Sequence, residues 1–401
     1  MRILLHDFSG HPFQVQLSRE LARMGHHVAH MYCPDYVSGH GGMGHRSSDP
    51  ASFQLVPVRM GGRWERYSPY QRIRQEFRYA ALAARATSEL DPEVYITCNV
   101  PLFASARLHQ IEKRKMRPQV YWLQDLYSVG ISSAVWSRSS AIGRAISPAL
   151  WDIEANLLRS SSAVVAITED FLPVLASWHV DLSRVQVVPN WAPIEELPAR
   201  PKDNSWAKRH NYHDVPVVLY AGTLGLKHDS QLLLALAAHL EKHTTSARVV
   251  VVSEGPTADR LVQSARNAGL ERLDVIPFQP WEEMPDVLGS ADVLVAVLSN
   301  EAGIFSVPSK ISTYLCSCRP VVAAVPTSNL SARIIRSVDA GLVVDQRDPA
   351  DFCAAVASLL KDPERGARLG SNGREFAETS YRIDHVARRF EELLESVLGR
   401  P

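Results

Sequence analysis

The stretch NEAGIFSVPSKISTYLCSCRPVVAAV, residues 300–325, shows most clearly how this chain folds. It follows the buried apolar run DVLVAVL, residues 292–298, and is typical of a strand end, a loop, a helix and another strand. Ser309 is placed to cap the helix, and Lys310 falls in its first turn. Arg319 and Pro320 end the helix and begin the next strand. The stretch therefore predicts a strand–helix–strand unit of a parallel sheet.

The residues of this junction favour a nucleotide sugar as ligand. A helix N-terminus offers free N–H groups and positive dipole charge, which suit a phosphate. The carboxylate of Glu301, at the end of the strand, suits the hydroxyls of a sugar. The alternative is an ordinary strand–helix junction with a surface glutamate.

Composition places the chain among globular proteins with two domains. It has 401 residues, 46% hydrophobic and 21% charged, which is more chain than one core usually holds. The formal net charge of zero argues against a protein that binds nucleic acid through its charge. Its five cysteines lack the paired spacing of zinc sites and are expected to be reduced thiols. We expect no signal peptide and no membrane-spanning segment.

Strands and helices alternate in two series. The apolar runs Met1–Phe8 and His27–Cys33 predict parallel strands, with the amphipathic helix Phe13–Met24 between them. A Pro-dense linker, residues 189–201, precedes a second series that begins with the strand Val215–Ala221. We predict an α/β protein with two doubly wound, Rossmann-like domains facing each other across a cleft. They span residues 1–198 and 199–380, and the final helix, about residues 381–401, packs back on the first.

Ligands of such sheets bind beyond the carboxyl ends of the strands. In the second domain the residues at those ends are Gly222, Thr223, Gly225 and Lys227, then Ser253 and Gly255, then Phe278 and Gln279, and finally Glu301 and Ser309. No dinucleotide fingerprint, Walker A motif or nucleophile elbow occurs. No metal site is visible, so we expect neither a metal nor a cofactor. In the first domain, the Gly- and His-rich loop at residues 38–49 is expected to be flexible until an acceptor binds.

Five motifs then carry a resemblance to a known family. They are FSGHPFQVQLSRELARMGHHV (8–28), YWLQDLY (121–127), VVPNWAPIEELP (187–198), VLYAGTLGLKHD (218–229) and VPSKISTYLCSCRPVVA (307–323). Together they resemble the family-4 (GT4) glycosyltransferases with the GT-B fold, most of all a bacterial polysaccharide-biosynthesis subgroup of the WcaI and WbuB type. The resemblance covers nearly the whole chain.

The resemblance implies a retaining, metal-independent transferase for surface polysaccharide. The donor would be a UDP- or GDP-linked sugar in the second domain, and the acceptor a saccharide or polyprenyl-linked oligosaccharide in the first. Catalytic roles would fall to Glu301, Lys227, Asp125 and His11. Donor contacts would come from Gly222, Thr223, Gly225, Ser253, Gly255, Phe278, Gln279, Gly303, Ile304, Phe305, Ser309, Lys310 and Thr313. Acceptor contacts would come from Gly10, Asn99 and Gln124.

The chain departs from the family pattern at three positions. Thr223 stands where many relatives have Arg, Thr313 where they have a second Glu, and Cys318 where Gly is common. Lys310 would replace the missing cation. Two alternatives to a transferase therefore stay open: a nucleotide-sugar epimerase or hydrolase of the same architecture, and a catalytically silent scaffold.

The expected location is the cytoplasm, with contact to the inner face of the cell membrane. Two basic clusters in the first domain support this contact: Arg72, Arg74 and Arg78, and then Lys113, Arg114, Lys115 and Arg117. The alternative is that both clusters are solvated helix faces.

Overall fold

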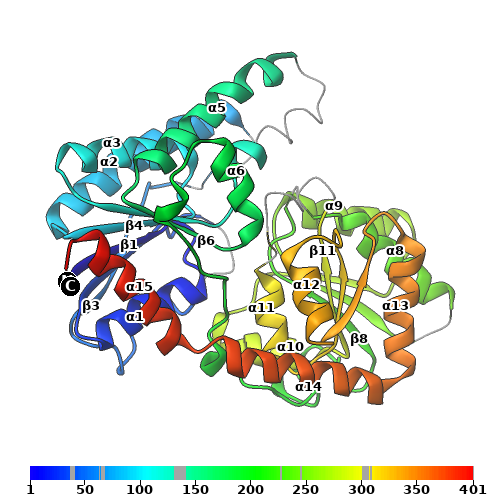
Figure 1. The fold of residues 1–401 in the computed structure, drawn as a ribbon. Coiled ribbons are helices and arrows are strands. Elements are labelled where there is room, and N and C mark those ends of the chain that lie inside the picture. The colour runs from blue at the N-terminus through cyan, green and yellow to red at the C-terminus, as the bar shows by residue number, and fades with distance from the viewer. Residues whose placement is uncertain are drawn as a thin grey trace. The chain divides into compact units, whose positions relative to one another are not determined.

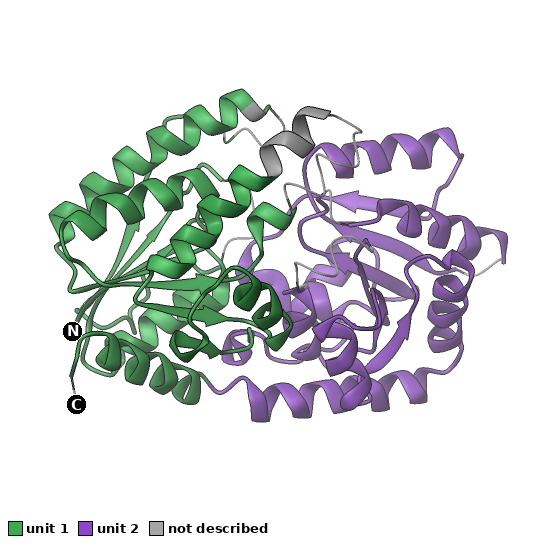
Figure 2. Cartoon of the chain, turned by 45° about the horizontal axis from the view of Figure 1, so that its top comes forward, with its two compact units in different colours: residues 1–190, 383–401 green, residues 191–382 purple. Residues whose placement is uncertain are grey.

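The computed structural model describes residues 1–36, 41–62, 64, 68–130, 141–225, 228–243, 246–299, 307 and 309–400. The chain forms two compact units (Figure 2). Unit 1 comprises residues 1–190 and 383–401, and unit 2 comprises residues 191–382. The first boundary therefore lies at Asn190 and not after residue 198, because Trp191, Ala192 and Leu197 are buried in unit 2. Arg374 secures this segment by donating to the Leu197 carbonyl oxygen at 2.7 Å.

The sheet of unit 1 has seven parallel strands in the order β3-β2-β1-β4-β5-β6-β7. The strands are β1 (Arg2–Asp7), β2 (His27–Tyr32), β3 (Phe53–Pro57), β4 (Val94–Cys98), β5 (Gln119–Leu123), β6 (Ala163–Ala166) and β7 (Val185–Val187). The sequence analysis missed β3. This edge strand is half exposed and ends in proline, so it lacks the continuous apolar run that marks the inner strands.

The helices of unit 1 cover both faces of this sheet (Figure 1). They are α1 (Pro12–Arg23), α2 (Pro69–Leu90), α3 (Leu102–Arg114), α5 (Ala141–Ser160), α6 (Leu172–Ser177) and α15 (Ile383–Val397). The helices α2 and α3 pack side by side, and α1 packs against α15. Glu391 of α15 lies 2.7 Å from His26 Nε2, and the Phe390 ring lies 4.7 Å from that of Trp122. The last helix is therefore part of unit 1.

The described part of the Gly- and His-rich loop contacts α1 and the turn before it. Gly41 N–H donates to the Gly10 carbonyl oxygen at 2.8 Å, and a Cβ at Gly41 would lie 2.5 Å from Pro12 Cα. Asp49 accepts from Arg19 Nε at 2.7 Å in a buried ion pair. Only glycine leaves room for this close approach, which brings residues 41–49 against the turn between β1 and α1. Residues 38–40 of the loop lie outside the described residues.

The sheet of unit 2 has six parallel strands in the order β10-β9-β8-β11-β12-β13. The strands are β8 (Val217–Ala221), β9 (Arg248–Val252), β10 (Leu273–Ile276), β11 (Val293–Val297), β12 (Val321–Ala324) and β13 (Gly341–Val344). The helices are α7 (Ser205–Arg209), α8 (Ser230–Lys242), α9 (Pro256–Asn267), α10 (Met284–Gly289), α11 (Lys310–Leu315), α12 (Leu330–Ser337), α13 (Pro349–Lys361) and α14 (Pro363–Ser380). Aliphatic side chains of β8, β9, β11 and β12 pack with α8 and α13 in one core. Both predicted doubly wound sheets are thus confirmed.

Candidate functional site

Each sheet has one point where the strand order reverses. It lies between β1 and β4 in unit 1, and between β8 and β11 in unit 2. The loops that leave such a pair of strands run to opposite sides, which opens a crevice at their carboxyl ends. The polar residues at each of these points are therefore candidate site residues, one group in each unit.

In unit 2 the glycine after β8 makes room for a lysine. Gly222 has a φ of +128°, and its N–H donates to the Val252 carbonyl oxygen at 3.0 Å. A Cβ on Gly222 would lie 3.3 Å from Lys310 Cε. Both the backbone conformation and the close approach favour glycine here.

Lys310 begins α11, and its ammonium lies against Tyr220 at the end of β8. Lys310 Nζ donates to the Tyr220 hydroxyl at 2.5 Å and lies 4.0 Å from the ring centroid. The same hydroxyl donates to the Thr223 carbonyl oxygen at 2.9 Å. Burial raises the pKa of Tyr220 well above its ordinary value, so the phenol keeps its proton. Tyr220 thus holds a cation beside the turn at Gly222 and Thr223.

The helix α11 is tied to the same strand end. The hydroxyl of Tyr314 accepts from Ala221 N–H at 2.8 Å and donates to the Ala221 carbonyl oxygen at 3.1 Å. Thr313 lies next to it and is half-buried. Ser309 occupies the predicted N-cap position of α11, but its side chain makes no capping hydrogen bond. Its φ and ψ are already helical, whereas capping side chains need an extended residue.

Three of the predicted donor residues stabilise or shape the loops that follow the strands of unit 2. Ser253 Oγ accepts from Leu224 N–H at 3.1 Å and so fixes the turn that contains Gly225. The Gln279 side chain accepts from the indole of Trp206 at 2.9 Å. Gly255 has a φ of +103° and precedes α9, which has no side-chain cap. Phe278 is half-buried. The predicted residues Lys227, Glu301, Gly303, Ile304 and Phe305 lie outside the described residues.

In unit 1 a buried carboxylate that the sequence analysis missed organises the strand end. Asp7 is the last residue of β1 and is fully buried. Its oxygens accept from Ser9 N–H at 3.1 Å and from His11 N–H at 2.5 Å. The Gln14 amide nitrogen donates to both oxygens, at 2.7 and 2.9 Å, because the opposite orientation would set its oxygen against the carboxylate. The signal in the sequence was Asp7 and His11 on either side of Gly10.

Asp7 also faces the imidazole of His11. His11 Nδ1 lies 3.5 Å from Asp7 Oδ1 and 3.2 Å from the Asn99 amide nitrogen. Burial would raise the pKa of Asp7, but the charge and hydrogen bonds of His11 outweigh it and the pKa is lowered. Asn99 follows β4 with a φ of +53°, a conformation that asparagine tolerates better than most residues. Gly10, His11 and Asn99 are thus brought together.

Two other predicted residues lie at the end of β5. Gln124 exchanges two hydrogen bonds with Asn190, at 3.1 and 2.6 Å, so its amide is paired within the protein. Asp125 is half-buried beside it. Buried Glu154 accepts from Tyr127 N–H at 2.9 Å and Ser128 N–H at 2.7 Å, and burial raises its pKa. Glu154 therefore occupies the backbone donors that follow this strand.

Over the described ranges, no group of three or more His, Cys, Asp and Glu side chains is arranged to hold a metal ion. Within the same ranges, the helices are all too short or too polar to cross a bilayer.

Comparisons with known families match nearly the whole chain. Residues 11–191 match the glycosyl transferase 4-like domain, and residues 202–376 match the glycosyl transferases group 1. D-inositol 3-phosphate glycosyltransferase of Nocardia farcinica is 29% identical over 59% of this chain and 54% of its own length. A GDP-mannose-dependent phosphatidylinositol monomannoside mannosyltransferase of Mycolicibacterium smegmatis is 27% identical over 51% of this chain and 53% of its own. The chain thus spans about half the length of these curated relatives.

Two solved structures share the fold over almost the full length. Sucrose-phosphate synthase of Thermosynechococcus elongatus has a TM-score of 0.71 at 15% identity and covers 99% of each chain. HepE of Anabaena, solved with UDP-glucose, has a TM-score of 0.70 at 15% identity and covers 99% of this chain and 100% of its own. With two matching family models and two parallel Rossmann-like sheets, the chain belongs to the GT4 glycosyltransferase family and has the GT-B fold.

Proposed function

We propose that this chain is a retaining, metal-independent glycosyltransferase. It transfers a sugar from a UDP- or GDP-linked donor to a saccharide or lipid-linked saccharide acceptor in the synthesis of bacterial surface polysaccharide. The observation that carries the proposal is the cation at the β8–β11 crevice, where Tyr220 holds Lys310 beside a glycine turn. A fixed cation at that place suits the diphosphate of a nucleotide sugar.

In this proposal unit 2 binds the donor. Lys310, Lys227 and the backbone at Gly222, Thr223 and Gly225 bind the diphosphate. Glu301 binds sugar hydroxyls with help from the amides of residues 303–305, and Thr313 contacts the ribose. Phe278 offers its ring to the base, and Ser253, Gly255 and Gln279 complete the donor contacts. Electrostatic stabilisation of the leaving diphosphate and orientation of the two substrates then supply most of the catalysis, and a donor phosphate oxygen helps to take up the acceptor proton.

Unit 1 binds the acceptor through Gly10, His11 and Asn99 at the β1–β4 crevice and through Gln124 and Asp125 at the end of β5. The named relatives act on an inositol phosphate and a phosphatidylinositol mannoside. We therefore include phosphorylated cyclitols and lipid-linked saccharides among the acceptors to be screened.

The test begins with a thermal-shift panel of UDP- and GDP-sugars, because a ligand that binds only the folded state raises the unfolding temperature. The stabilising donor is then incubated with and without acceptors, and the products are analysed for anomeric configuration. Product without acceptor indicates the alternative hydrolase or epimerase. No stabilisation by any donor indicates the silent scaffold and refutes the proposal.

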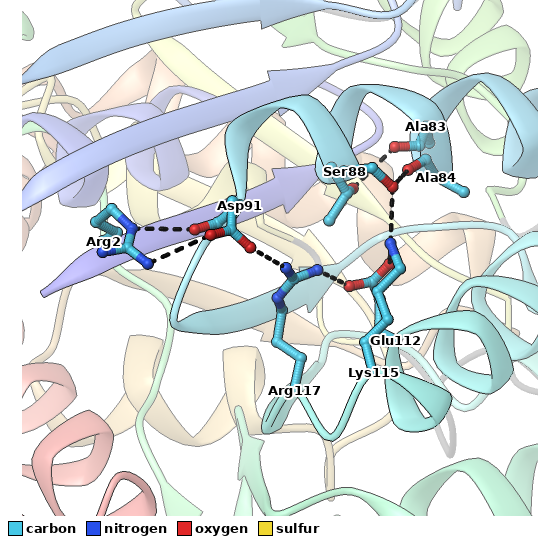
Figure 3. Close-up of polar contacts among 9 residues, drawn as sticks. Arg2, Ala83, Ala84, Ser88, Asp91, Glu112, Lys115 and Arg117 are labelled. Carbon is cyan, nitrogen blue, oxygen red and sulfur yellow. Dashed lines mark hydrogen bonds and ion pairs between the residues drawn. The ribbon is translucent and has the colours of Figure 1, made fainter.

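Membrane contact is part of the proposal, and the contacts of the basic residues favour the first of the two clusters. Figure 3 shows that Lys115 and Arg117 belong to a polar network at the C-terminal ends of α2 and α3. Arg117 pairs with Asp91 at 2.8 Å and also with Glu112, and Lys115 donates to Ser88 at 2.7 Å. The charges of Lys115 and Arg117 are therefore engaged by other side chains of the protein.

The first half of α2 instead presents an apolar stripe: Tyr70, Ile73 and Phe77, which are 77%, 39% and 50% exposed. Their spacing places them on one side of the helix. Exposed Arg74 and Arg78 lie on the same turns. Apolar side chains next to arginines suit an anionic lipid surface.

The variant Ile73→Ser with Phe77→Ser should lose sedimentation with phosphatidylglycerol vesicles. Met116→Ser is the control, because Met116 is 89% exposed at the other end of α3. High salt should weaken wild-type binding. Equal binding by both variants, or no binding of the wild type at low salt, would refute the contact.

A further inference from the structure

The carboxyl ends of β9 and β10 carry an exposed carboxylate that the proposed function leaves unused. The two strands are parallel neighbours, and Val252 pairs with Ile276 where they end. Two residues further along each strand, Glu254 Oε1 accepts from the Phe278 N–H at 3.2 Å. The other oxygen, Oε2, has no hydrogen-bond or ion-pair partner among the residues that the structure describes. One oxygen of Glu254 is thus held beside Phe278, and the other is available to a ligand.

The neighbouring polar side chains are already engaged within the protein. Ser253 is buried, and its Oγ accepts from a backbone N–H at 3.1 Å. Gln279 uses both ends of its amide: Oε1 accepts from the Trp206 indole at 2.9 Å, and Nε2 donates to the Pro277 carbonyl oxygen at 2.9 Å. Of the polar side chains that directly follow β9 and β10 in the described part of the chain, that of Glu254 is therefore the one open to a ligand.

Space for a ligand lies beside this carboxylate. Gly255 has a φ of +103°, and apart from its chain neighbours a Cβ on it would have no atom of the described residues within 4 Å. Phe278 is half-buried, and the proposed function places the base of the donor on its ring. Because Glu254 is bound to the backbone N–H of that same residue, its carboxylate lies within reach of the edge of a base on the ring.

A carboxylate at the edge of a base distinguishes guanine from uracil. An ionised carboxylate only accepts hydrogen bonds. Guanine presents two adjacent donors, N1–H and the 2-amino group, which can bond to both carboxylate oxygens in charge-assisted hydrogen bonds. Uracil presents a single N–H between two carbonyl oxygens, and their negative partial charges would repel the carboxylate. The same group therefore attracts one base and disfavours the other.

We propose that Glu254 recognises the base of the donor and makes this chain selective for a guanosine-diphosphate sugar. This inference deepens the proposed function and rests on it. The N1–H and 2-amino groups of guanine donate to the carboxylate, while the Phe278 N–H keeps that carboxylate in place. Little ordering cost then offsets the gain, because the group is positioned before the nucleotide arrives. UDP keeps the diphosphate contacts with Lys310 and binds more weakly.

The structural alternative is that Glu254 only joins the turn after β9 to the end of β10. Glu254→Gln separates the two roles. The amide oxygen of glutamine still accepts from the Phe278 N–H, but its NH2 group sets a donor against the donors of guanine. A purely structural role predicts that the affinities for different nucleotides stay the same or change together.

The experiment is titration calorimetry of the whole chain with GDP, inosine diphosphate (IDP) and UDP. IDP differs from GDP only in lacking the 2-amino group. The wild type should bind GDP about 10-fold more tightly than IDP and about 10- to 100-fold more tightly than UDP, as expected for hydrogen bonds to a charged group. In Glu254→Gln the preference for GDP over IDP should disappear, and UDP binding should not weaken.

A matched control is Glu241→Gln on α8. Glu241 Oε1 accepts from the N–H groups of Glu271 and Arg272, at 2.6 Å each, just before β10 begins. It makes the same kind of contact as Glu254 at the opposite end of the same strand. This control should leave all three affinities unchanged, and thermal unfolding of both variants checks that each is folded.

Equal affinities of the wild type for GDP and UDP, or for GDP and IDP, would overturn the role of Glu254 and leave the proposed function standing. An equal loss for all three nucleotides in Glu254→Gln would also overturn it, because that result shows a purely structural contact. If the wild type binds no nucleotide at all, the proposed function itself fails, and the choice of base fails with it.

Discussion

Replacing Lys310 with alanine should weaken UDP binding by about 10- to 100-fold. The ammonium is held at the β8–β11 crevice by a 2.5 Å hydrogen bond to Tyr220 and by the face of its ring. A hydrogen bond from such a cation to a phosphate contributes about 1.5–3 kcal/mol, and each 1.4 kcal/mol is tenfold in affinity. The cation is already in place before the ligand arrives, so little ordering cost offsets this gain.

The assay is titration calorimetry with UDP and with uridine. Lys310→Ala should lose affinity for UDP and leave uridine unchanged, because uridine carries no phosphate. Lys113→Ala on α3 is the control, since Lys113 is exposed on unit 1. Equal effects of the two substitutions, or an equal loss for uridine, would refute the placement of Lys310 at the diphosphate.

A double-mutant cycle extends this test to Tyr220. Tyr220→Phe removes the hydroxyl that accepts from Lys310 and keeps the ring. If the hydroxyl positions the ammonium, Tyr220→Phe should weaken UDP binding in the wild type and have little effect in Lys310→Ala. Additive losses would show that the two residues act independently.

Three further predictions concern stability and backbone conformation. Cys318→Gly should raise stability by about 1 kcal/mol in thermal or urea unfolding, because Cys318 has a φ of +59° that glycine adopts without strain; an unchanged or lower midpoint would contradict this. Gly222→Ala should cost about 1–3 kcal/mol and also weaken UDP binding, because its φ is +128° and the new Cβ would press on Lys310; unaltered binding would show that Lys310 can move freely. The free energy of unfolding should fall as the pH is lowered from 6.5 towards 4. His6 and His30 should each contribute about 1.4 kcal/mol per pH unit to this fall. Their folded pKa values of about 3 and 4 lie below the unfolded value of 6.5, so only the unfolded chain takes up protons in this range. Urea unfolding of wild type and His30→Gln at pH 7, 6 and 5 checks it, and parallel curves for the two proteins would contradict the part assigned to His30.

The sequence alone determined the fold class and most of the elements. Parallel strands buried on both faces are continuous apolar runs, and β11 and β12 are visible as such in residues 292–298 and 320–325. The edge strand β3 was not predicted, because half of it is exposed and its sequence is not a continuous apolar run. Packing moved the domain boundary: the Pro-dense segment after Asn190 looked like a linker, but its Trp191 and Leu197 are buried in unit 2.

The sequence also placed glycines and polar residues at the carboxyl ends of the strands, because a strand end can be read from the chain itself. Which of them meet depends on strand order, and strand order is a tertiary property. Asp7 and Asn99 meet across 92 positions because β1 lies beside β4, and Lys310 meets Tyr220 across 90 positions because β11 lies beside β8. Only the packed sheet of unit 1 places Asn99 beside Asp7, and only that of unit 2 places Tyr220 beside Lys310.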